Sequence, residues 1–298
     1  MKQLNIAIIG LGLIGGSLGL AIKHHYGAQV MVAGVDQDAG TLAYALGSGA
    51  VDSAGTDSRT AASQADIVFL CTPVLQIVPV VQNIIPCLKP GTILSDVGST
   101  KQYLYEKISG LLPADIHYVA GHPMAGSEQS GIMAADKDLF RDKCYIIIPE
   151  TARLASAAEK ICSLLSCTGA KITAMELAQH DRCAAVISHA PHVTAAALVH
   201  LLGLRPAELG NNLKLAGGGF RDTTRIASSN ADMWADICLS NPEAIADSLT
   251  HLQGIIGQVI ADIRREDRES VHAFFKTAKL RRDSLIQASF CPSAGNAE

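Results

Sequence analysis

The stretch Leu4–Ser17, LNIAIIGLGLIGGS, decides the fold that the sequence predicts. Its first half is a continuous apolar run, typical of a strand buried on both faces of a parallel sheet. Its second half places Gly10, Gly12 and Gly15 in the pattern GxGxxG, and a helical stretch opens at Ser17. A strand, spaced glycines and a helix in this order form the turn that cradles a pyrophosphate.

Each glycine of this turn has its own physical task. Gly10 makes the tight turn, Gly12 lets the backbone approach a pyrophosphate, and Gly15 lets the helix pack closely on the sheet. We expect this loop to bind a dinucleotide through these glycines and the residues between them, Leu13 and Ile14.

An acidic residue follows the second apolar run, VMVAGVD, at Asp36. A carboxylate there can accept hydrogen bonds from ribose hydroxyls and would repel a 2′-phosphate, which predicts NAD rather than NADP. Asp38 is an alternative for the ribose contact, but Asp36 directly follows the strand and is preferred.

Apolar runs and helical stretches alternate up to about residue 175, which predicts a doubly wound α/β sheet of the Rossmann type. The expected strands are 4–9, 30–35, 67–71, 92–95, 118–120, 145–148 and 171–174, and the expected helices are 17–26, 41–48, 75–85, 101–112 and 153–166. Beyond residue 175 only helices are expected, at 176–202, 207–215, 222–228, 231–239 and from 242 to about 286. We therefore predict a Rossmann domain over 1–175 and a helical domain over 176–298. The mixed charges at 264–269 are interpreted as the solvated face of the last long helix.

Polar residues follow several of the predicted strands, and a Rossmann sheet binds its ligand beyond these carboxyl ends. Thr72 and Pro73 follow one strand, Ser99 follows the next, and His122 follows a third within GHPMAGSE. We expect Ser99 and His122 to meet near the nicotinamide, where an imidazole can act as an acid or base.

The composition narrows the class of protein. A net charge of -4 gives no electrostatic footprint for nucleic acid. The run 4–22 is apolar, but five glycines argue against a signal helix. No other stretch is expected to be long enough to span a bilayer. Eight scattered cysteines without a CxxC pair indicate reduced thiols in a cytoplasmic protein. His189 and His192 lie three apart but no convincing third ligand follows, so no metal site is expected.

Five motifs occur together in this order: GLGLIGGS, SDVGSTK, GHPMAGSE, HDRCAAVISHAPH and GGGFRDTTRIA. In this combination the chain resembles the prephenate dehydrogenases of tyrosine biosynthesis and their close relatives, the arogenate dehydrogenases. The resemblance implies a Rossmann domain followed by a helical dimerisation domain. It also implies NAD-dependent oxidative decarboxylation of prephenate to 4-hydroxyphenylpyruvate, in which a hydride leaves a cyclohexadienol and the ring becomes aromatic.

The resemblance also implies roles for particular residues. His122 would accept the proton of the substrate's ring hydroxyl, with a pKa near the unperturbed 6.5, and Ser99 would orient it. Arg225 would bind a substrate carboxylate, and His192 the side-chain end of the substrate. The other implied pocket residues are Ser127, Glu128, His180, Arg221 and Asp222, with Trp234 nearby. On the residues alone, His180 could equally cap or pack, and Arg221 and Arg225 could be surface arginines paired with Asp222.

Three other functions stay open at this stage. Arogenate dehydrogenase activity differs only in the substrate's amino group, and no residue here decides it. A 3-hydroxy acid dehydrogenase would rely on a lysine in the helical domain, and 176–202 contains none. A non-catalytic dinucleotide sensor would need neither His122 nor Arg225. The apolar segment CAAVISHAPHVTAAALVHLLG predicts a homodimer through the helical domain. We expect a small-molecule substrate, and neither nucleic acid nor a membrane as a partner.

Overall fold

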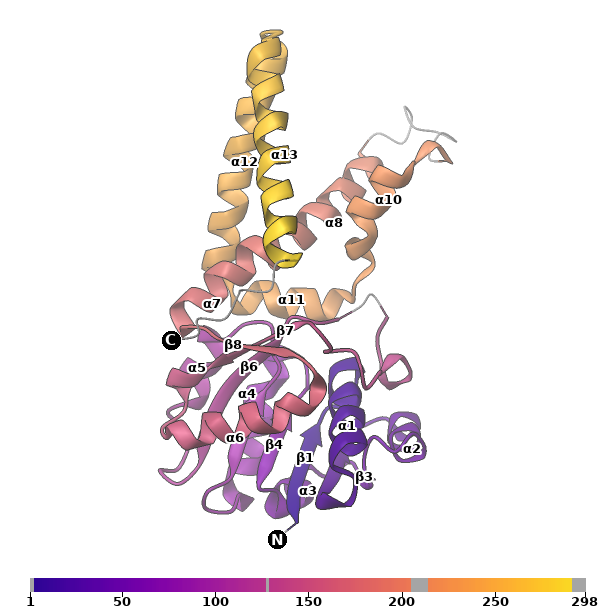
Figure 1. The fold of residues 1–298 in the computed structure, drawn as a ribbon, viewed down its shortest axis with the longest axis vertical. Coiled ribbons are helices and arrows are strands. Elements are labelled where there is room, and N and C mark those ends of the chain that lie inside the picture. Colours follow the sequence, from indigo (N-terminus) through magenta and orange to yellow (C-terminus); the bar gives the residue numbers. More distant parts are fainter. Residues whose placement is uncertain (1–2, 127–128, 205–213, 291–298) are drawn as a thin grey trace. The chain divides into compact units, whose positions relative to one another are not determined.

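The computed structural model of the chain describes residues 3–126, 129–204 and 214–290. The chain divides into two compact units, residues 1–245 and residues 246–298. The first unit holds an eight-stranded sheet with helices on its faces and a helical segment after it, which confirms the predicted fold class (Figure 1). The domain boundary predicted after residue 175 stays a prediction.

The sheet has the strand order β3-β2-β1-β4-β5-β6-β7-β8. Neighbouring strands from β3 to β6 pair in parallel, β7 runs antiparallel to β6, and β8 is parallel to β7. The strands are β1 Leu4–Ile9, β2 Val30–Val35, β3 Ser53–Gly55, β4 Ile67–Leu70, β5 Ile93–Asp96, β6 His117–Pro123, β7 Cys144–Ile148 and β8 Lys171–Ala174. Only β3 was not expected, because Ser-Ala-Gly has neither an apolar run nor high strand propensity.

Side chains of β1 alternate between two apolar cores, one on each face of the sheet. Ile6 and Ile8 join the first core with residues of α1 and α6, whereas Ala7 and Ile9 join the second with residues of α4 and α5. The helices are α1 Leu13–Tyr26, α2 Ala39–Gly47, α3 Ser58–Gln64, α4 Val74–Ile84, α5 Gln102–Ile108 and α6 Ala155–Leu165. Short 3₁₀ turns lie at Gly27–Gln29, Ile85–Cys87, Ile132–Ala134, Pro149–Thr151 and Ser166–Thr168. Helix α3 was not expected, and begins where Asp57 accepts a hydrogen bond from the backbone of Arg59.

A continuous helical run follows the sheet. It comprises α7 Leu177–Ala184, a π-helical turn Ala185–His189 and α8 Ala190–Gly203. After it come α10 Gly218–Thr224, a 3₁₀ turn Arg225–Ser228 and α11 Ala231–Ser240. The predicted helix 207–215 falls largely outside the described residues.

The helical run Leu177–Gly203 is long and apolar enough to cross a membrane, contrary to the expectation that no stretch beyond the N-terminal run would be. Length and composition alone are weak evidence, because core helices of globular proteins pass the same test. His180 and Asp181 of this run are buried and hydrogen-bonded to the sheet-bearing part of the same unit. These bonds favour a packed helix of the first unit.

The single helix predicted from 242 to about 286 was wrong. The chain forms α12 Pro242–Arg264 and α13 Arg268–Phe290, and a turn separates them. Glu266 has a positive φ of 55°, and Asp267 accepts hydrogen bonds from the backbone and hydroxyl of Ser270 at the start of α13. The charged run 264–269 therefore contains a turn at 265–267 and does not form one continuous helix face, since Asp267 caps a new helix.

Candidate active site

The glycine-rich loop has the geometry that a dinucleotide requires. Gly10 adopts φ +96°, and a Cβ built on Gly15 would lie 2.0 Å from the Gly10 carbonyl oxygen, so a side chain fits at neither position. A Cβ on Gly12 would meet no protein atom within 4 Å, so the backbone there faces open space. Leu13 and Ile14 form the first turn of α1 beside this opening. The loop therefore leaves room for a pyrophosphate at the start of α1.

Asp36 lies directly after β2 and reaches this loop. Its Oδ2 accepts a hydrogen bond of 2.9 Å from the backbone N–H of Leu11, and its Oδ1 accepts one of 3.1 Å from that of Asp38. The Asp38 carboxylate caps α2 instead, because it accepts a hydrogen bond of 2.6 Å from the Thr41 N–H. The geometry thus favours Asp36 over Asp38 as the ribose ligand.

The carboxyl ends of β4, β5 and β6 place the remaining predicted cofactor and catalytic residues along one edge. The Thr72 hydroxyl, just after β4, is buried without a protein partner, which leaves it able to bond a ligand. Pro73 precedes α4, and Ser99 is half-buried three residues beyond β5. His122 lies within β6 and is buried. Ser127 and Glu128 lie outside the described residues.

His122 belongs to a chain of three buried side chains. Its Nδ1 lies 2.9 Å from Nε2 of His180, and Nδ1 of His180 lies 2.7 Å from Oδ1 of Asp181. His180 is fully buried, and both its ring nitrogens have partners. His180 therefore has no ring nitrogen left for the predicted hydrogen bond to substrate, and it bonds to His122 instead.

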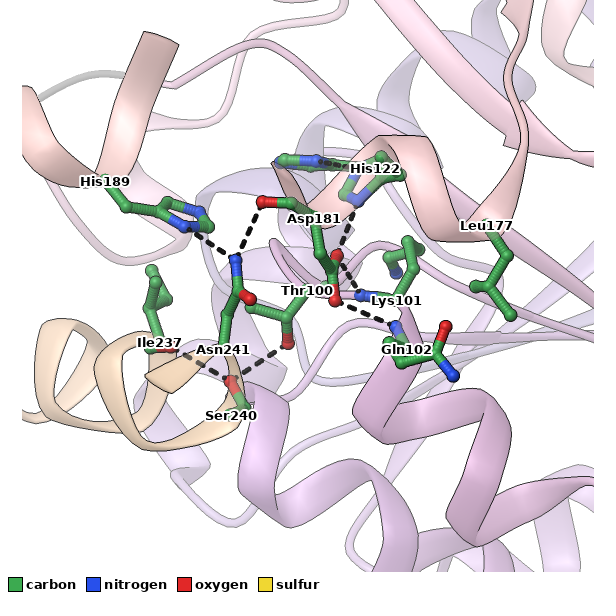
Figure 2. Close-up of polar contacts among 12 residues, drawn as sticks. Thr100, Lys101, Gln102, His122, Leu177, Asp181, His189, Ile237, Ser240 and Asn241 are labelled. Atoms are coloured by element: carbon green, nitrogen blue, oxygen red, sulfur yellow. Dashed lines mark hydrogen bonds and ion pairs between the residues drawn. The ribbon is translucent and has the colours of Figure 1, made fainter. Parts of the chain in front are cut away.

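Asp181 fastens the helical run to the start of α5. Its two carboxylate oxygens accept hydrogen bonds of 2.8 and 2.9 Å from the backbone N–H groups of Lys101 and Gln102, as Figure 2 shows. The Asn241 amide donates to the Asp181 carbonyl oxygen at 2.9 Å. Thr100 donates to Ser240 at 2.9 Å, which ties the loop after β5 to α11. These bonds hold His180 in place within hydrogen-bond distance of His122.

A buried ion pair supports the same strand ends. Lys101 and Asp96 are fully buried and paired, and the Lys101 ammonium also donates to the Gly121 carbonyl oxygen at 2.8 Å. The Tyr118 hydroxyl donates to Asp96 at 2.8 Å. This network fixes the backbone directly before His122. Both residues lie in the motif SDVGSTK, but no local pattern in that motif indicates a role for Asp96 or Lys101.

The environment of His122 corrects the pKa expected for it. Burial lowers the pKa of His122 well below 6.5, and the neighbouring His180, Lys101 and His189 lower it further. At neutral pH the imidazole is therefore uncharged. A neutral imidazole can accept a proton, which is the state that a general base needs.

A second group of polar side chains lies on the helical segment. His192 stacks on Trp234 with ring centroids 3.9 Å apart, and its Nδ1 faces the Ser188 carbonyl oxygen at 2.9 Å. Burial lowers the pKa of His192. The hydrogen bond to Ser188 raises this pKa, and the positive charge of Arg225 lowers it. Arg225 is exposed, as are Arg221 and Asp222 on α10. His189 is buried, with Nε2 lacking a protein partner.

The Rossmann sheet carries an open glycine loop and an acidic residue after β2, and this combination defines an NAD-dependent dehydrogenase. The family models for the prephenate dehydrogenase nucleotide-binding domain and dimerization domain match residues 18–174 and 176–277. The chain belongs to the prephenate dehydrogenase family.

Individual relatives agree with this assignment. The chain is 37% identical to the prephenate dehydrogenase of Bacillus subtilis, over 94% of this chain and 76% of that protein. The crystal structure of prephenate dehydrogenase from Aquifex aeolicus in complex with hydroxyphenyl propionate and NAD+ matches with a TM-score of 0.89 and 27% identity, over 96% of this chain and 99% of that one. Arogenate dehydrogenase from Synechocystis matches with a TM-score of 0.79 and 31% identity, over 95% of this chain and 100% of that one.

Proposed function

We infer that the chain catalyses the NAD-dependent oxidative decarboxylation of prephenate to 4-hydroxyphenylpyruvate, a step of tyrosine biosynthesis. The observation that carries this inference is the buried, uncharged His122 at the carboxyl end of β6, in a sheet whose Gly10–Gly15 loop leaves room for a dinucleotide. Family membership supplies the substrate class.

NAD, when bound along the glycine loop, supplies the hydride acceptor. Loss of the ring carboxylate as carbon dioxide makes the ring aromatic, so the reaction runs strongly downhill. The protein therefore has to hold the substrate, exclude water and take one proton. His122 takes the proton of the ring hydroxyl, and Ser99, three residues beyond β5, orients His122 beside the nicotinamide.

The helical segment supplies the substrate's other ligands in this proposal. Arg225 binds a carboxylate of prephenate through its fork of donors. His192, held against Trp234, contacts the side-chain end of the substrate. Arg221 and Asp222 lie on α10 and are further substrate ligands in this proposal. The resemblance assigns the same role to Ser127 and Glu128, which lie outside the described residues.

L-Arogenate is the alternative substrate, because the chain is 31% identical to an arogenate dehydrogenase. The two substrates differ at the side chain, where one carries a ketone and the other an amine. Steady-state assays of NADH formation with both substrates, in parallel, test the proposal. We expect a higher kcat/KM for prephenate, and a higher value for arogenate would reverse the assignment.

We also propose that the protein is a cytoplasmic homodimer. The second unit exposes Ile255, Ile256, Ile263 and Phe275, each about half exposed or more, and such apolar surface is typical of an interface. The cysteines in the described part are free thiols, which suits a reducing compartment. Sedimentation at micromolar concentration should give a dimer, and a monomer would contradict this proposal.

A further inference from the structure

The protonation pattern of the chain His122–His180–Asp181 follows from which atoms can donate. Asp181 is the fixed end of the chain. Burial raises the pKa of Asp181, but hydrogen bonds from His180 and from the Lys101 and Gln102 N–H groups outweigh it and lower the pKa below its ordinary value. The carboxylate is therefore ionised and can only accept.

His180 comes next in the chain. Because Oδ1 of Asp181 cannot donate, the hydrogen in the 2.7 Å contact sits on Nδ1 of His180. The His180 ring is fully buried, and a buried site favours the uncharged form of a ring, which carries a single hydrogen. A neutral imidazole with hydrogen on Nδ1 has a bare Nε2, which must act as an acceptor.

His122 is therefore left with one possible arrangement. Its Nδ1 faces the bare Nε2 of His180 at 2.9 Å, so Nδ1 carries the hydrogen and donates it. Nε2 of His122 is then the bare nitrogen. We propose that Asp181 and His180 are positioning residues that fix the tautomer of His122, so that its Nε2 is the atom that takes the substrate's hydroxyl proton.

The proton transfer in this inference rests on the proposed function, whereas the tautomer of His122 rests on the hydrogen-bond geometry alone. During turnover the hydroxyl proton moves to Nε2 of His122 as the hydride leaves for NAD. Loss of carbon dioxide leaves a phenolate oxygen, and the proton returns to it from Nε2, so no other proton needs to move along the chain. The imidazolium that forms keeps its Nδ1–H bond to His180, and through His180 it faces the Asp181 carboxylate. Orientation of a catalytic histidine by a buried acid is known to set its tautomer in serine proteases.

The direct test is a nitrogen NMR measurement of the His122 tautomer in 15N-histidine-labelled protein, with and without NAD. The chain has ten histidines, and the His122→Asn variant assigns the signal of interest by its loss. We expect Nδ1 protonated and Nε2 bare at neutral pH. A wild-type His122 with the hydrogen on Nε2 would overturn the proposal.

Substitution of His180 separates positioning from simple packing. His180→Phe keeps the ring but removes the acceptor, so part of His122 should shift to the Nε2–H tautomer. Turnover should fall by roughly 10²- to 10⁴-fold, with KM for prephenate changed less. His180→Gln, whose amide can accept from His122 and donate to Asp181, should restore part of the turnover. His24→Phe, a matched change at an exposed position on α1, should alter neither readout.

The outcomes divide cleanly. An unchanged tautomer and turnover in His180→Phe would refute the positioning role. If that variant does not fold, the wild-type tautomer and the His180→Gln variant decide. A wild-type protein that produces no NADH with prephenate or arogenate would refute the proposed function, whereas the tautomer measurement would still stand or fall by itself.

Discussion

Replacing Lys101 with methionine should destabilise the first unit by about 3 to 5 kcal/mol. The ammonium and the Asp96 carboxylate form a fully buried pair, and methionine matches the length of lysine without its charge. After the change, Asp96 keeps its hydrogen bonds from Tyr118 and from the Gly98 N–H, but its charge is no longer balanced. The Gly121 carbonyl also loses its donor, directly before His122.

The opposite single change should cost less. In Asp96→Asn the buried ammonium loses its partner, but burial already lowers the pKa of Lys101, so this group can shed its proton. The double variant Asp96→Asn/Lys101→Met removes both charges together. We expect it to recover about 2 kcal/mol or more of the loss in Lys101→Met, since an uncompensated buried charge causes most of that loss.

Urea unfolding followed by tryptophan fluorescence measures these free energies, because the single tryptophan, Trp234, lies in the first unit. Lys89→Met is the matched control. Lys89 pairs with Asp66 at 2.8 Å but is partly exposed, so its loss should cost less than about 1 kcal/mol. If Lys101→Met is no more destabilising than Lys89→Met, or if the double variant is no more stable than Lys101→Met, the reasoning about the buried pair is refuted.

His122→Asn should fold and bind NAD but lower turnover by roughly 10²- to 10⁴-fold, and near-normal turnover would remove His122 from the chemistry. In the wild type the His122 base works when uncharged, so kcat/KM falls as the pH drops through the pKa of His122. Because burial lowers this pKa, the fall in kcat/KM should lie below pH 6.5. The same fall should be absent in the variant. The wild type should show a higher kcat/KM with NAD than with NADP, and Asp36→Ser should narrow the difference; equal efficiencies in the wild type would rule out Asp36 as the discriminating residue. Arg225→Ala should raise KM for prephenate by roughly tenfold or more with a smaller change in kcat, as loss of a charged hydrogen bond predicts, and an unaltered KM would argue that Arg225 does not bind the substrate.

Local patterns in the sequence predicted most of the sheet, because buried strands read as continuous apolar runs. Strands 4–9, 30–35 and 171–174 have the predicted bounds. β3 and α3 were not predicted, because their small and polar residues show no hydrophobic periodicity. The reversal of β7 and β8 escaped as well, since strand direction depends on connections rather than on composition. The turn at Glu266 was missed because a charged run looks the same on a helix face and in a capped turn.

The candidate site was only partly accessible from sequence. The glycine loop and His122 could be found because their tasks are local. The partners of His122 could not, because His180 lies 58 residues away and meets it only through packing. The motif HDRCAAVISHAPH placed Asp181 next to His180, and an acid beside a histidine was the one available signal. Nothing local marked Asp96 and Lys101 as buried, since charged residues are usually exposed.

The π-helical turn Ala185–His189 determines where this chain can change in length. Each residue of an α-helix advances the side-chain direction by about 100°, so a deletion in α7 would rotate the start of α8 and carry His192 away from Trp234. The π-helical turn already holds one more residue per hydrogen-bonded turn than an α-helix does. Removing one residue there could tighten it to a regular helical turn while His180 and His192 keep their directions. Homologous sequences should therefore vary in length at this turn before they vary on either side of it.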